Sequence, residues 1–304
     1  MAGLILGFMV LPLALGILIA GLGQLVDTLR SRGSARSAQA RSLGASAATG
    51  AVGVTATLTW LGLAEGLNED IRLSTVPALG CAAAVLTAAV SELTWPKPTG
   101  AVRVASLSGR RSVRPAGLQR LAVTGFAATA LALVVGGLTA APDGRSFTRR
   151  TADVVATSSP YPGASYAVAV GVATVLLALA TWFAWARVDA RPALGPGREA
   201  LDTAVRGVSM VRVLRPAAVG SLGTAAGLWL TMGATVGSVT QNLRMNDLGQ
   251  APQPPFDWVQ NLGFAALGIG VVLGFLAVVA LASASPRLPR EERGAVTDGA
   301  RVSA

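Results

Sequence analysis

Long apolar segments alternate along the chain with shorter segments that hold nearly all of the charge. Each apolar segment is about 20 residues long, the length at which an α-helix crosses the hydrocarbon core of a bilayer. The segments run over about residues 3–23, 44–63, 73–93, 121–141, 164–186, 216–237 and 262–281. This pattern predicts an all-α integral membrane protein, a bundle of about seven transmembrane helices that forms one domain over residues 1–283.

The composition decides between a membrane protein and a soluble protein with a large core. Hydrophobic residues make up 52% of the 304 residues, charged residues only 13%, and the mean hydropathy is +0.57. A chain with so few charged residues lacks the polar side chains that would cover a soluble surface of this size. The bilayer is therefore the expected solvent for most of the molecule.

The distribution of Lys and Arg predicts the orientation of the helices. Cytoplasmic loops of membrane proteins are enriched in these residues. With the N-terminus outside and the C-terminus in the cytoplasm, 20 of the 25 Lys and Arg residues fall in inner segments and 5 in outer ones. We therefore expect a multi-pass protein of the plasma membrane with a polar cytoplasmic tail, disordered over residues 284–304. The segment 3–23 lacks a positive stretch before it, so it is predicted to be a retained helix and not a signal peptide.

The sequence offers few groups for chemistry. It contains no histidine and one cysteine, Cys81, which lies among apolar residues of a predicted helix. The charged residues fall in loops, tails or the last turn of a predicted helix, and Glu92 is interpreted as an interfacial residue that ends one helix. Phosphate-binding, metal-binding and nucleophile motifs are missing from the sequence as well. We therefore expect no cofactor and no metal, and the chain is more plausibly not an enzyme.

The net charge of +10 does not predict nucleic-acid binding, because the Arg residues separate apolar segments instead of gathering on one polar face. The segment 198–215 instead has apolar residues at helical spacing, which predicts an amphipathic helix lying on the inner leaflet. Its basic residues are candidates for binding anionic lipid or a cytoplasmic partner such as an ATPase. They are Arg198, Arg206, Arg212 and Arg215.

A second candidate binding segment lies in the outer loop before the last helix. Residues 251–258 combine several prolines with Phe256 and Trp258. Such a segment is typical of a binding loop, and it is equally typical of a stiff connection that leads into a membrane helix. Both interpretations stay open at this stage.

Small residues are expected to hold the helices together, because lipid gives apolar helices no hydrophobic reason to associate. The pairs Gly3/Gly7, Gly223/Gly227 and Gly270/Gly274 each place two glycines on one helix face. Close approach of neighbouring backbones is therefore predicted for the bundle as a whole.

These observations favour a non-catalytic membrane subunit, a permease-like or accessory component of a bacterial transport or export assembly. One alternative is a membrane-embedded enzyme that acts on lipid or glycan through carboxylates of the outer loops. Another is a signalling or structural membrane protein whose loops only bind. Substrate, partner and oligomeric state are not specified by the sequence.

Overall fold

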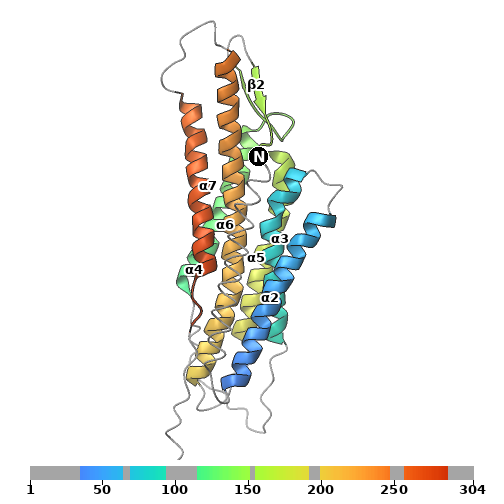
Figure 1. Ribbon diagram of the computed structural model, residues 1–304, viewed down its shortest axis with the longest axis vertical. Coiled ribbons are helices and arrows are strands. Elements are labelled where there is room, and N and C mark those ends of the chain that lie inside the picture. Colours follow the sequence, from blue (N-terminus) through green and yellow to red (C-terminus); the bar gives the residue numbers. More distant parts are fainter. Residues whose placement is uncertain are drawn as a thin grey trace, which may run out of the picture.

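The computed structural model describes residues 35–63, 69–93, 115–150, 155–191, 199–246 and 257–286. Most of these residues form long helices (Figure 1). The helices are α2 (Ala35–Leu63), α3 (Glu69–Leu93), α4 (Ala116–Thr139), α5 (Ala164–Ala190), α6 (Glu199–Asn246) and α7 (Trp258–Ala282). A short hairpin of two strands, β1 (Phe147–Arg150) and β2 (Val155–Ser158), lies between α4 and α5 in sequence.

Five of the six described helices, α3 to α7, are long and apolar enough to cross a membrane. The molecule is therefore consistent with an all-α, multi-pass membrane protein, as the apolar segments predicted. The predicted segment 44–63 lies within α2, which is a continuous helix of 29 residues. The predicted segment 3–23 and the tail from 287 onward lie outside the described residues, so the count of seven stays a prediction.

The helix α6 differs from the sequence prediction. It is one helix of 48 residues, whereas a separate interfacial helix over 198–215 and a membrane helix beginning at Pro216 were expected. Proline removes one backbone hydrogen bond from a helix interior. The helix nevertheless continues through Pro216 because Val213, Leu214 and Ala217 around it are fully buried against other helices. The apolar face of 199–215 therefore packs against protein, not lipid.

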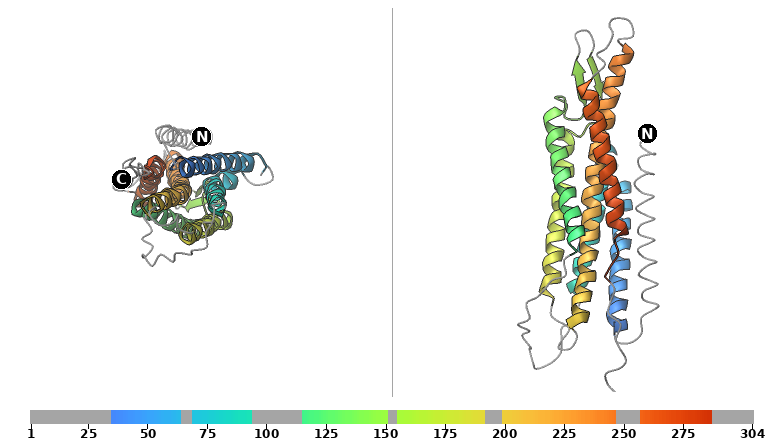
Figure 2. Two further views of the ribbon diagram at one scale, coloured as in Figure 1. Left: turned by 90° about the horizontal axis from the view of Figure 1, so that it is seen from below. Right: turned by 90° about the vertical axis from the view of Figure 1, so that its left-hand side faces the viewer.

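The helix α6 is the central column of the bundle (Figure 2). It contacts every other described helix and both strands. The remaining helices follow one another around it in the order α2, α3, α5, α4 and α7, each in contact with the next. The helix α2 contacts mainly α3 and lies at one edge of the arrangement (Figure 2).

Small residues permit the close approach between helices that the sequence predicted. A Cβ atom added at Gly233 in α6 would lie 2.6 Å from the carbonyl oxygen of Gly263 in α7, which real structures do not tolerate. At Gly125 in α4, an added Cβ would lie 2.6 Å from the backbone nitrogen of Leu222 in α6. Glycine is thus required where α6 meets two of its neighbours.

The hairpin lies between the predicted segments 121–141 and 164–186, where no strand was predicted from the sequence. The strands β1 and β2 pair antiparallel, with Phe147 opposite Ser158 and Arg150 opposite Val155. The side chains of Phe147 and Ala156 pack against Val239 and Leu243 near the end of α6. Strands of only four residues give a weak pattern in the sequence, and packing against α6 supplies the missing stabilisation.

Candidate functional site

Five charged side chains form a cluster at the end of the bundle where α3 and α5 end and α6 begins. We call this set the charged cluster and this end of the bundle the charged end. The set comes from the last turn of α3, the residue after α5 and the first half of α6. Its members are Glu92, Arg191, Asp202, Arg206 and Arg212.

The carboxylate of Glu92 lies at the centre of the cluster, between two arginines. Its Oε2 is 3.5 Å from Nη1 of Arg191, and its Oε1 is 3.7 Å from Nη1 of Arg212. The side chains of Glu92 and Arg191 are only 3% and 1% exposed. The Nε of Arg212 also donates to the hydroxyl of Ser46 in α2, at 3.1 Å. Glu92 and its two arginines therefore connect α2, α3 and α6 with the end of α5.

Arg206 fixes the end of α5 to α6. Its Nε donates to Asp202 one helical turn earlier, at 2.7 Å. Its Nη2 donates to the backbone carbonyl of Arg191 at 2.6 Å, and its Nη1 to that of Val188 at 3.1 Å. The last carbonyls of a helix have no partner within the helix and carry partial negative charge. Arg206 thus caps α5 from a neighbouring helix.

The charged cluster combines three arginines with two carboxylates, so it carries a formal charge of +1. Burial lowers the pKa of Arg191, while the charges of Glu92 and Asp202 act in the opposite direction. Buried charges are stable only when they are paired and hydrogen-bonded. The arrangement can therefore hold four helices in one geometry, and separating the helices would leave charges unpaired.

Arg215 lies at the same end but belongs to a different contact. It donates through Nη2 to the backbone carbonyl of Ser283, which directly follows α7, and to the hydroxyl of Ser285 at 3.3 Å. It therefore caps α7 as Arg206 caps α5. Two arginines of the central helix fix the ends of two neighbouring helices.

The structure separates the residues that the sequence singled out as one binding face. Arg206 and Arg212 belong to the charged cluster, whereas Arg215 contacts the end of α7. Trp258 is the first residue of α7 at the opposite end of the bundle and is 64% exposed. Arg198 and Phe256 lie outside the described residues.

Glu92 lies in the last turn of α3, as the sequence predicted, but its side chain is almost fully buried among arginines. The sequence also missed Arg191 and Asp202 as members of one site. The spacing of Asp202 and Arg206, four residues apart on a helix, is the one local signal of pairing. The contact between Glu92 and Arg191 joins residues 99 positions apart, which no local pattern records.

The opposite end of the bundle carries the hairpin, and we call it the hairpin end. Neutral hydrogen bonds join the hairpin region to α6. The hydroxyl of Thr235 donates to the carbonyl of Pro160 at 2.5 Å, and the hydroxyl of Ser238 donates to that of Ser158 at 2.7 Å. The rings of Phe147 and Tyr161 lie against each other with centroids 5.4 Å apart. The hairpin is thereby fixed to the central helix.

One ion pair at the hairpin end connects the hairpin to α7. Nη1 of Arg149 lies 2.5 Å from Oδ2 of Asp257, the residue before the helix. Oδ1 of Asp257 accepts from the backbone nitrogen of Val259, so the same carboxylate caps α7. Partial burial acts to raise the pKa of Asp257. The hydrogen bond and charge of Arg149, together with backbone hydrogen bonds from Val259 and Gln260, hold this pKa below its ordinary value.

Asp143 and Asp257 were among the outer-loop carboxylates that the enzyme alternative relies on. Oδ1 of Asp143 accepts from the backbone nitrogens of Arg145 and Ser146, both at 3.1 Å. These hydrogen bonds lower the pKa of Asp143, the one from Arg145 most strongly. Both carboxylates therefore stabilise a turn or a helix end in this structure.

No known protein family, curated protein or solved structure matches the chain.

Proposed function

We propose that this chain is a non-catalytic membrane subunit, a permease-like or accessory component of a bacterial transport or export assembly. The observation that carries the proposal is the length and fixation of α6. With 48 residues, α6 is about 72 Å long at the rise of an α-helix. A bilayer with its headgroups is about 40–45 Å thick. The central helix therefore extends well beyond the lipid and provides protein surface for a partner.

Both ends of α6 are fixed to the rest of the bundle. At the charged end, Arg206 and Arg212 connect it to α5, α3 and α2. At the hairpin end, Thr235 and Ser238 hold the hairpin region. A subunit that docks partners needs a surface whose shape is set before binding, because ordering it during association costs affinity. The fixed ends of α6 supply such surfaces.

The proposal includes an orientation, in which the charged end faces the cytoplasm and the hairpin end lies outside. It is supported by the excess of Lys and Arg in the segments at the charged end. Cytoplasmic partners, an ATPase among them, and anionic lipids of the inner leaflet would then meet the charged end. Fusion of a reporter that is active only in the cytoplasm, placed after residue 286, tests this orientation. Activity of the fusion is expected, and its absence would reverse the orientation.

The subunit proposal is tested by isolating the protein from its native membrane at native expression level in mild detergent. Mass spectrometry then identifies what accompanies it in constant stoichiometry. We expect an ATPase, a second permease or another membrane protein, which an unrelated tagged membrane protein of equal abundance does not bring down. Isolation of the chain alone would refute the proposal. It would favour the enzyme alternative, for which Glu69 and Asp70 at the start of α3 are the other described carboxylates on the side proposed to lie outside.

A further inference from the structure

One face of α2 is covered by α3, and the opposite face is free of contacts within the part of the chain that the structure describes. A Cβ added at Gly53 would lie 3.2 Å from Cβ of Ala84 in α3, so Gly53 faces that helix. Residues two positions away on a helix point about 200° apart. Ala51 and Thr55 therefore lie on the side away from α3, and both are exposed.

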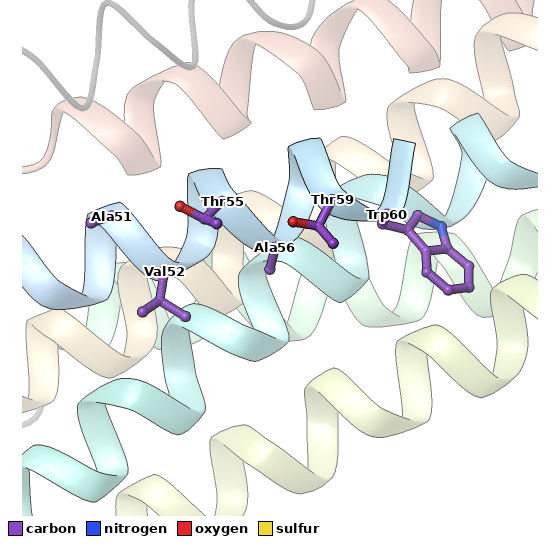
Figure 3. Close-up of a pocket in the computed structure, with 6 residues that line it drawn as sticks. All are labelled: Ala51, Val52, Thr55, Ala56, Thr59 and Trp60. Carbon is purple, nitrogen blue, oxygen red and sulfur yellow. The ribbon is translucent and has the colours of Figure 1, made fainter. Parts of the chain in front are cut away.

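This free face forms a shallow groove (Figure 3). Ala51, Thr55 and Thr59 follow one another at four-residue spacing along it, and Figure 3 shows their side chains on the side of α2 turned away from α3. The other residues that line it are Val52, Ala56 and Trp60. Small side chains at this spacing let the backbone of a second helix approach closely.

The groove differs from the surfaces that face lipid elsewhere on the bundle. Exposed positions of α4, α5 and α7 carry large apolar side chains, such as Leu138, Trp182 and Phe275, which are 82%, 72% and 67% exposed. Large side chains fill the space between a helix and lipid tails, whereas small ones leave it open. On α2, the exposed row Ala51, Thr55 and Thr59 consists of small residues, and the larger Val52 and Leu58 beside it are 40% and 62% exposed. This row therefore has the composition of a contact between helices.

We propose that the amino-terminal apolar segment 3–23 of the same chain occupies this groove as an antiparallel helix. The chain supplies this segment directly before α2, which begins at Ala35. As a helix of 21 residues it would be about 31 Å long, which matches the apolar part of α2. Its own small residues, Gly7, Ala14 and Gly21, lie at seven-residue spacing and fall on one face.

A segment of the same chain is favoured over a second copy by its effective concentration. The residues between the apolar segment and α2 form a connection of about 11 residues, long enough to join two adjacent antiparallel helices. A short linker holds its two ends at an effective concentration in the millimolar range, well above that of a second copy in a membrane at ordinary abundance. The intramolecular contact therefore forms first.

Cysteine crosslinking in native membranes tests this proposal. Cys81 is replaced by alanine, one cysteine is placed at Thr55, and a second is moved through Gly7 to Leu15, leaving Pro12 unchanged. A protease site between residues 24 and 34 reports an intramolecular disulfide, because the two fragments stay joined until reduction. We expect crosslinking at positions one helical turn apart and several-fold less at those between.

A cysteine at Val172 is the matched control, because this residue of α5 is also exposed, at 56%, but its neighbours Val175 and Leu176 on the same face are large and exposed. It is expected to give no disulfide with the apolar segment. Covalent dimers formed through Thr55→Cys would overturn the proposal in favour of a second copy. If a Thr55→Cys variant that is monodisperse in detergent formed no disulfide, the proposal would be overturned, and lipid would be the occupant of the groove.

Discussion

The two ends of the bundle are held by different kinds of contact. At the charged end, five ionic side chains are largely buried and join α3, the end of α5 and α6. At the hairpin end, the contacts with α6 are hydroxyl-to-carbonyl or hydroxyl-to-hydroxyl bonds and apolar packing. The one described ion pair there, Arg149 with Asp257, is partly exposed. The same central helix is therefore fixed by charge at one end and by shape at the other.

This difference predicts how each end responds to substitution. Neutral hydrogen bonds between membrane helices contribute about 0.6 kcal/mol each on average. Removing one member of a buried ionic cluster leaves an uncompensated charge, which typically costs about 3–5 kcal/mol. Substitutions at the charged end should thus reduce stability most when they change the charge, and those at the hairpin end when they change the volume.

The largest effect is expected for Glu92→Gln. The substitution keeps the size of the side chain but leaves Arg191 and Arg212 without their shared carboxylate. We expect the free energy of unfolding in detergent to fall by about 3–5 kcal/mol. Titration with denaturant, followed by tryptophan fluorescence, measures this value.

Glu69→Gln is the matched control for this substitution, because Glu69 begins the same helix and is exposed. Its effect should stay within about 0.5 kcal/mol. Equal losses for the two variants would show that burial of Glu92 among arginines contributes nothing to stability. The two ends of the bundle would then not differ in the kind of contact that stabilises them.

Much of the fold was predictable from the sequence, because apolar segments of about 20 residues specify membrane helices directly. The segments 121–141, 164–186 and 262–281 correspond to α4, α5 and α7 within a few residues at most of their ends. The boundary at Pro216 was wrong because proline is tolerated when its neighbours are buried, and burial in a bundle is not visible locally. The hairpin was missed because its strands are four residues long and depend on α6.

The candidate site was predicted less well than the fold. Arg206 and Arg212 were selected because they are basic residues on a helical face, but the expected partners were anionic lipid or a cytoplasmic protein. In the structure their partners are Glu92, Asp202 and the carbonyls at the end of α5. In the sequence, a carboxylate that is buried between helices looks the same as one that is exposed to solvent, because both end an apolar segment. The packing of the helices against one another determines whether the side chain is buried.

A second, smaller effect is expected at the hairpin end for Gly136→Ala. An added methyl group would collide with the carbonyl oxygen of Pro162, which directly precedes Gly163, the N-cap residue of α5. Overpacking of this kind costs about 1–3 kcal/mol. The loss is measured by the same denaturant titration, and it should come with weaker protection of residues 155–158 from hydrogen exchange.

The adjacent residue provides the control for volume at this end. An added Cβ at Gly137 meets no atom within 4 Å. Gly137→Ala should therefore be neutral or raise the free energy of unfolding by about 0.5–1 kcal/mol, since alanine favours the helix. If Gly136→Ala were as harmless as Gly137→Ala, the contact between α4 and the hairpin region would not determine stability at this end.

The smallest effect is expected for Asp257→Asn, which removes the charge but keeps a good helix cap. Its ion pair with Arg149 is partly exposed, so the loss near pH 7 should be at most about 1 kcal/mol and smaller still at high salt. Because the pKa of Asp257 is lowered in the folded state, the charged form stabilises the protein above the unfolded pKa of about 4 and loses this contribution as pH falls through the folded pKa. Unfolding titrations of both proteins from pH 7 to 3 should therefore converge in acid. A difference that persisted unchanged below pH 4 would mean that the hydrogen-bond geometry, not the charge, stabilises this contact, and the hairpin end would then be held by shape alone.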